Sequence, residues 1–133
     1  MNRDLARGVR ERAGNRCEYC RLPQSVIPLP FQIDHIIAEQ HGGKSDEENL
    51  ALACPSCNRY KGPNIAGRDG EGGELVPLFN PRTDAWTDHF ESTSGSIIAR
   101  TAVGRVTIQV LHINAPDRVA LRRQLMQETG RKA

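Results

Sequence analysis

Four cysteines stand in two C-x-x-C pairs, Cys17 with Cys20 and Cys54 with Cys57. A gap of two residues lets both thiolates of a pair reach one ion, and two pairs complete the tetrahedral site that zinc prefers. Four thiolates leave no open position on the metal, so we expect a structural Zn²⁺ site. The alternatives are unpaired structural cysteines or a redox-active C-x-x-C.

Polar residues of the types used in metal-assisted phosphodiester hydrolysis lie between the cysteine pairs and just beyond the second pair. They are Asp34, His35, His41, Asn49, Asn58 and Lys61. A carboxylate and an amide oxygen suit a hard divalent cation such as Mg²⁺ or Mn²⁺. A neutral imidazole near pH 7 can take a proton from an attacking water, and the cation would stabilise charge on the phosphate.

Asp34 and His35 are neighbours in the run IDHII, whose isoleucines indicate a buried strand. Neighbours in a regular strand point to opposite faces. We therefore expect Asp34 to face a metal held against the following helix, and His35 to face a water on the far side of the phosphate. Focusing both groups on one phosphate requires some bending at the end of the strand.

The elements that position these residues follow from the local patterns. A short arginine-rich helix is predicted over residues 4–13, ending at Gly14. The run FQIDHII at 31–37 and the apolar residues 49–53 are predicted strands, separated by the polar glycine turn of residues 40–46. A helix is predicted to begin near Cys57 and to carry Asn58 and Lys61.

The second half of the chain is predicted to be a flexible polar loop at 62–73, an extended segment at 75–82, a β-hairpin and a final helix. The hairpin would pair 96–100 with 105–113 across the turn TAVG. Asn114 would cap the last helix, Pro116 falls in its first turn, and its apolar face is formed by Leu121, Leu125 and Met126.

The composition is that of one domain spanning residues 1–133. A net charge of +2 with 26% charged residues permits nucleic-acid binding without demanding it. No apolar run approaches the ~18 residues of a membrane span, and the N-terminus has no signal-peptide h-region. We therefore expect a cytoplasmic protein without membrane contact; whether it is a monomer or a homodimer stays open.

The run IDHIIAEQHGGKSDEENLALACPSCNRYKG resembles the motif of the HNH endonuclease family, which has the ββα-metal fold. The matching stretch is about residues 17–62 and combines C-x-x-C, D-H, E-N-L and C-x-x-C-N-x-x-K. The resemblance implies an α+β fold with a treble-clef-like ββα-metal core at 14–62 that contains the zinc knuckles. Residues 63–133 would then be a family-specific extension containing the β-hairpin and the final helix.

The resemblance also implies roles. His35 matches the general base, Asp34 the metal-binding carboxylate, and Asn49 the residue that braces the loop between the two strands. Asn58 stands where the second histidine usually lies, which makes this an H-N-N variant with Asn as an oxygen ligand. This departure favours Mg²⁺ or Mn²⁺ over a transition metal at the catalytic site.

Lys61 would lie one helical turn beyond Asn58 and could touch the scissile phosphate, which adds it to His35 and Asn49 in the expected catalytic set. Arg59 and His41 are further candidates for contact with nucleic acid. Each of these three side chains is instead a solvated surface group in the simpler interpretation.

The expected function is a metal-dependent endonuclease that hydrolyses DNA phosphodiester bonds. A non-catalytic, zinc-stabilised nucleic-acid-binding module is the alternative, and a protein-interaction domain is a third. The set of Asp34, His35, Asn49 and Asn58 favours the enzyme, because a binding module has no need of a base beside a carboxylate.

Overall fold

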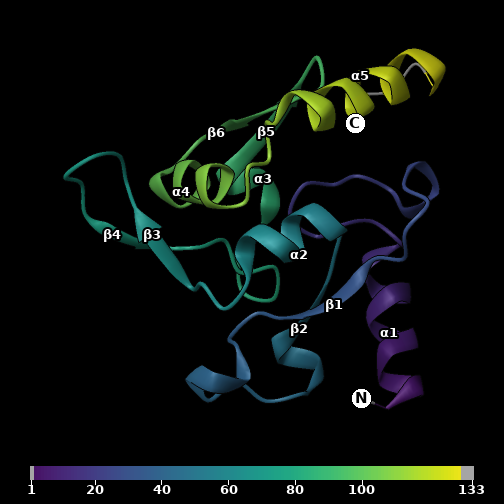
Figure 1. Cartoon of the computed structure of the whole chain (residues 1–133), viewed down its shortest axis with the longest axis vertical. Helices are drawn as coiled ribbons and strands as arrows, with labels where there is room; N and C mark the ends of the chain where they lie inside the picture. The colour runs from purple at the N-terminus through teal and green to yellow at the C-terminus, as the bar shows by residue number, and fades with distance from the viewer. Residues whose placement is uncertain (1, 130–133) are drawn as a thin grey trace.

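Two short antiparallel strands and the helix after them form the ββα unit that the sequence predicts (Figure 1). The computed structural model describes residues 2–129. Strand β1 (Gln32–His35) pairs with β2 (Leu50–Ala53), so that Gln32 lies opposite Ala53 and His35 opposite Leu50. Helix α2 (Pro55–Lys61) begins two residues after β2 and packs against both strands. The predicted α+β fold with a ββα core is confirmed.

Helix α1 (Arg3–Ala13) packs against β2 and confirms the helix predicted at the N-terminus. Asn2 caps it by accepting hydrogen bonds from two backbone N–H groups of the first turn, which would otherwise lack partners. Arg10 and Arg12 point back toward the protein and donate to the backbone oxygens of Phe31 and Leu50. These two arginines therefore fasten the helix to the strands.

The loop that joins β1 to β2 contains two of the three short 3₁₀ turns of the described chain. These turns are η1 (Gln24–Val26) before β1, and η2 (Glu39–His41) and η3 (Glu47–Asn49) between the strands. Gly42 ends η2 with a φ of 91°, a conformation that glycine adopts without steric cost. The predicted polar glycine turn is thus an ordered connection between the two strands.

The second half of the chain contains two hairpins and three helices. Its elements are β3 (Ala66–Arg68), β4 (Leu75–Pro77), α3 (Trp86–His89), β5 (Phe90–Thr93), β6 (Ser96–Ala99), α4 (Ala102–Val110) and α5 (Pro116–Thr129). Strand β3 pairs with β4, and β5 pairs with β6. The flexible polar loop predicted at 62–73 contains the short strand β3, which the prediction overlooked.

The predicted strand at 105–113 was wrong, because residues 102–110 form helix α4. Its β-branched composition favoured a strand, but Val103, Val106 and Val110 recur at helical spacing. The side chain of Thr101 caps the helix by accepting from the backbone N–H of Gly104 at 3.1 Å. The strand at 96–99 pairs instead with the preceding strand β5.

The end of the chain departs from the prediction as well. Asn114 does not use its side chain to cap α5; its amide bonds to both the backbone N–H and the carbonyl of Ile97. Leu121 is only partly buried against the core, whereas Arg118 and Arg122 are buried on the same helix. The face of α5 that packs on the protein therefore combines these two arginines with the predicted Leu121.

One contiguous cluster of buried side chains includes residues from both halves of the chain. In Figure 1 the elements α4, α5 and β5–β6 lie together at the top of the view and α2 lies at their boundary with the N-terminal strands. Phe79 links the halves, since its ring packs edge-on against Tyr19 at 6.5 Å and against Phe90 at 5.3 Å. None of the helices within residues 2–129 is long and apolar enough to span a lipid bilayer.

The close approach of α4 to α3 generates a stability prediction. A Cβ atom at Gly104 would lie 2.3 Å from the backbone oxygen of His89. Gly104→Ala should therefore lower the free energy of unfolding by about 2 kcal/mol or more.

Gly8→Ala is the matched control, since nothing lies within 4 Å of a Cβ atom placed at this exposed position of α1. It should stabilise the protein by about 0.5–1 kcal/mol. Urea denaturation of both variants measures the two effects, and equal stabilities would contradict the packing of α4.

Candidate functional site

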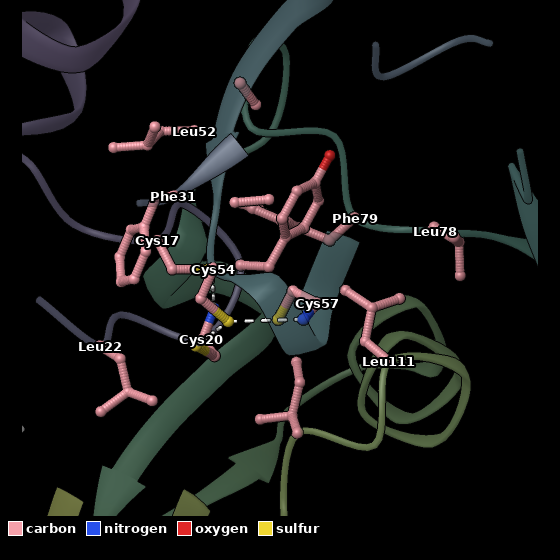
Figure 2. Close-up of a cluster of buried hydrophobic side chains, with 14 of the residues drawn as sticks. Cys17, Cys20, Leu22, Phe31, Leu52, Cys54, Cys57, Leu78, Phe79 and Leu111 are labelled. Carbon is pink, nitrogen blue, oxygen red and sulfur yellow. Dashed lines mark hydrogen bonds between the residues drawn. The ribbon is translucent and has the colours of Figure 1, made fainter. Parts of the chain in front are cut away.

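The four cysteines converge in the middle of the buried cluster (Figure 2). Cys17 and Cys20 follow α1, Cys54 is the N-cap of α2, and Cys57 lies in its first turn. All four Sγ atoms lie within 4.8 Å of one another, and those of Cys20 and Cys54 are 3.7 Å apart. Tetrahedral zinc with Zn–S bonds of about 2.3 Å places its sulfurs about 3.8 Å apart. The residues therefore fit a zinc ion with four thiolate ligands.

Local backbone geometry supports this arrangement. The N–H of Cys20 points to Cys17 Sγ, and the N–H of Cys57 points to Cys54 Sγ, each at 3.4 Å. Each C-x-x-C pair thus forms a knuckle in which the backbone donates to the first sulfur. Hydrogen bonds from N–H groups favour the charged thiolate, which is the form that binds metal.

A separate open cleft of about 340 Å³ lies at the junction of β1, η2 and α2. Asp34, His35 and Asn58 all line it, together with Glu39 and Gly62 at its rim. The first two are adjacent in sequence, and the strand that carries them ends at His35. Tertiary structure thus brings to one surface the carboxylate, the imidazole and the amide that the sequence singled out.

Asp34 is buried, with 5% of its surface exposed, and its carboxylate is fully engaged on the protein side. Oδ2 accepts a hydrogen bond of 2.7 Å from the hydroxyl of Tyr19, and Lys61 Nζ lies 3.3 Å from Oδ1 and 3.2 Å from Oδ2. Burial raises the pKa of Asp34 above its ordinary value, while the charge of Lys61 and the Tyr19 hydrogen bond act in the opposite direction. A carboxylate offers about four lone-pair directions, so these three contacts do not use all of its accepting capacity.

His35 is partly exposed, with 21% of its side chain accessible. Its Nε2 lies 2.8 Å from the hydroxyl oxygen of Ser45 and 3.7 Å from a carboxylate oxygen of Glu39. Both partners come from the loop between the strands. They hold the ring in place while its edge stays open to water.

Asn49 makes the contacts of a brace across that loop. Its Oδ1 accepts from the N–H of Ile37 at 2.8 Å, and its Nδ2 donates to the carbonyl oxygens of Ile37 and Lys44, each at 2.9 Å. Three hydrogen bonds from one side chain hold both ends of the loop that carries the two partners of His35. Asn49 therefore connects residues of this loop and is not among the residues that line the cleft.

Asn58 projects from the first turns of α2 and is partly buried. Its side chain has no hydrogen-bond partner among residues 2–129, so the amide oxygen is available to a ligand in the cleft. The oxygen donors of Asp34 and Asn58 suit a hard divalent cation. The pair therefore fits Mg²⁺ or Mn²⁺.

The candidates for phosphate contact are placed differently from one another. Lys61 is 1% exposed and donates to the backbone oxygen of His35 as well as to Asp34, so in this structure its ammonium is bound within the protein. Arg59 is exposed on α2, where its guanidinium stacks over the ring of Tyr60. His41 is exposed at the end of η2, outside the cleft lining.

Several residues in contact with the two sites were not anticipated from the sequence. They are Tyr19, Glu39, Ser45 and Arg118. Tyr19 lies inside the first C-x-x-C, and Arg118, near the start of α5, is 61 residues from Cys57. Glu39 is a near neighbour of His35 in the sequence, at a spacing of four residues. Arg118, in contrast, acquires its partner only when the distant helix α5 packs against the cysteines.

The cysteine geometry predicts the metal content of the protein. Purified protein should contain about one zinc per chain, and Cys57→Ser should lose most of it, because three thiolates hold zinc less tightly than four. Elemental analysis with a thermal melt of each sample measures both metal and stability. Ser56→Ala, one residue away, is the control and should keep both its zinc and its melting temperature. If the wild-type protein contains no zinc, the assignment of a four-cysteine zinc site is wrong.

The buried pair of Asp34 and Lys61 predicts a large effect on stability. Lys61→Met removes the counter-charge of a buried carboxylate, which should cost about 3–5 kcal/mol. The double variant Asp34→Asn/Lys61→Met should recover most of that loss, because no isolated charge is left. Urea denaturation of zinc-loaded protein without added Mg²⁺ measures the free energy of unfolding of the wild type and of each variant. Arg59→Met, on the exposed side of the same helix, should be close to wild type; a Lys61→Met variant of equal stability would contradict the pairing.

Two comparisons with known proteins found matches to this chain. The sequence model described as HNH endonuclease matches residues 17–64, a stretch that contains both cysteine pairs and every polar residue of the cleft. The Septu protein PtuB of Bacillus thuringiensis is 24% identical over 118 residues, which is 87% of this chain and 43% of that protein. The chain thus spans less than half the length of this curated relative. No solved structure matches the chain. Residues 17–64 therefore form a domain of the HNH endonuclease family, in the variant that carries four clustered cysteines.

Proposed function

We propose that this protein is a metal-dependent endonuclease that hydrolyses phosphodiester bonds in DNA. The observation that carries the proposal is the convergence of Asp34, His35 and Asn58 on one open cleft. A base, a carboxylate and an unpaired amide at one solvent-filled surface are what hydrolysis of a phosphodiester requires. The domain family adds support for a nuclease.

In this proposal His35 accepts the proton of the attacking water. The neighbouring Ser45 hydroxyl fixes the ring, and the Glu39 carboxylate lies where it can pair with the imidazolium that the transfer creates. Asn49 maintains the loop that presents both partners. These contacts pre-order the base, which removes the entropy cost of positioning it in the transition state.

Asp34 and Asn58 are the proposed ligands of the catalytic cation. A bound Mg²⁺ or Mn²⁺ would stabilise negative charge on the phosphate and on the leaving 3′-oxygen. Tyr19 and Lys61 hold the carboxylate of Asp34, a residue that lines the cleft. Lys61 is thus assigned a positioning role in place of the predicted contact with phosphate. Arg59 and His41, both exposed near the cleft, remain the proposed contacts to the nucleic-acid backbone.

One observation favours the alternative of a zinc-stabilised nucleic-acid-binding module without cleavage. The ammonium of Lys61 already neutralises Asp34, so the carboxylate has a counter-charge before any metal binds. Binding without cleavage would show as DNA affinity that falls with salt and does not depend on Mg²⁺ or Mn²⁺.

A cleavage assay separates the two functions. Zinc-loaded protein should nick or cut duplex, single-stranded or branched DNA when Mg²⁺ or Mn²⁺ is added. His35→Ala should lower the rate by about 10²–10⁴-fold, the usual contribution of a general base. Asn58→Ala should raise the Mg²⁺ concentration needed for half-maximal rate.

The matched control is His112→Asn, which alters a histidine outside the cleft and keeps a residue type that tolerates the positive φ of 51° at this position. It should cut like the wild type. Elemental analysis must show that each variant retains zinc. If wild-type protein with full zinc leaves every substrate intact, or if His35→Ala cuts at the wild-type rate, the proposed function is wrong.

A further inference from the structure

Helix α5 buries two arginines beside the cysteine cluster. Arg118 is 2% exposed and Arg122 is 0% exposed, and the spacing of four residues places them on one face of the helix. Removing a guanidinium from water is costly unless an anion compensates its charge. Each of these two guanidiniums therefore needs a negatively charged group nearby.

Arg118 joins the metal centre to the end of α4. Its Nη2 lies 2.8 Å from Cys57 Sγ and 3.5 Å from Cys54 Sγ, both ligands contributed by α2 and its N-cap. Its Nη1 donates to the carbonyl oxygens of Leu111 and His112 at 2.9 and 3.1 Å. These carbonyls follow the last turn of α4, and that of His112 also accepts a hydrogen bond of 3.1 Å from the backbone N–H of Ala115.

Arg122 extends the same contact network by one turn. It donates to the carbonyl oxygens of Gly95 at 2.6 Å and Ile113 at 2.7 Å, and to the side-chain oxygen of Asn114 at 3.3 Å. The tip of the β5–β6 hairpin, the α4–α5 connection and the metal centre are thus held by two adjacent arginines.

Carboxylates do not compensate these charges. Within residues 2–129 no Asp or Glu forms an ion pair with Arg118 or Arg122. Arg118 Nε and Arg122 Nη1 are buried without any hydrogen-bond partner in this part of the chain. The guanidiniums are therefore held by an incomplete set of hydrogen bonds. The groups beside Arg118 that become negative on binding zinc, as thiolates, are the sulfurs of Cys54 and Cys57.

We propose that Arg118, supported by Arg122, provides the counter-charge of the zinc centre and thereby couples metal binding to the docking of the C-terminal helix α5. Zinc with four thiolates carries a net charge of about −2. Two buried guanidiniums balance that charge, and the hydrogen bond from Arg118 to Cys57 orients a ligand in the way that outer partners of metal sites do. When zinc is removed, the sulfurs no longer form a fixed anionic cluster, and α5 loses the interaction that offsets the burial of its arginines. This inference does not depend on cleavage of DNA.

The decisive variant is Arg118→Met, which keeps most of the side-chain volume and removes the charge. Zinc should pass from this variant to a chromogenic chelator at about 10–100-fold lower chelator concentration than from wild type, the usual effect of losing an outer partner. With zinc still bound, chymotrypsin should cut α5 at Leu121, Leu125 or Met126 at least about tenfold faster, because the helix docks less firmly. Mass spectrometry of the fragments locates the cuts.

Arg123→Met is the matched control. Arg123 lies on the same helix, is exposed, and donates only to the backbone oxygen of Ser94. Its zinc affinity and its protease pattern should equal those of the wild type.

A spectroscopic measurement makes the test independent of global stability. In cobalt-loaded protein the thiolate-to-cobalt charge-transfer band should shift in Arg118→Met and stay in place in Arg123→Met. If Arg118→Met does not fold, the same measurements are made on Arg118→Lys, with Arg123→Lys as its control. Lysine retains the positive charge but cannot reproduce the planar fork of arginine, so Arg118→Lys should still show the change. Unchanged zinc affinity and unchanged protection of α5 in the position-118 variant would overturn the proposal.

Discussion

The convergence of four sulfurs is the constraint on which the rest of the structure depends. Cys17 and Cys20 tie the segment after α1 to Cys54 and Cys57 at the start of α2, across more than thirty intervening residues. Those residues form the two strands and the loop of the candidate active site. With a core that contains few aromatic side chains, a metal ion linking both ends of this segment supplies order that apolar burial alone would not.

The two sites are adjacent but chemically separate. Helix α2 contributes sulfur to one and Asn58 and Lys61 to the other, so a single short helix relates their positions. Soft thiolates at the buried site select zinc, whereas the oxygen donors at the open cleft suit a hard cation. Damage to the zinc site should therefore disturb the cleft through the orientation of α2, without any exchange of ligands between the sites.

The C-terminal half is more than an appendage to the ββα unit. It buries Phe79 and Phe90 in the shared core and places Arg118 against the sulfurs. Arginine is suited to this position because its planar fork can serve a sulfur and backbone oxygens at the same time. The extension thus participates in the metal centre even though it provides none of its ligands.

The sequence by itself determined the elements whose signals are local: the N-terminal helix, the paired strands, the knuckles and the identity of the cleft residues. It failed at 102–110, where β-branched composition masked a helical period, and it left open whether Lys61 is exposed. Only the tertiary structure decided that Lys61 is buried against Asp34, that Ser45 supports His35, and that Arg118 faces Cys57. The physical reason is that spacing along the chain determines which side chains share one face of a helix or strand. The burial and pairing of a charged side chain depend instead on which distant segment packs over it.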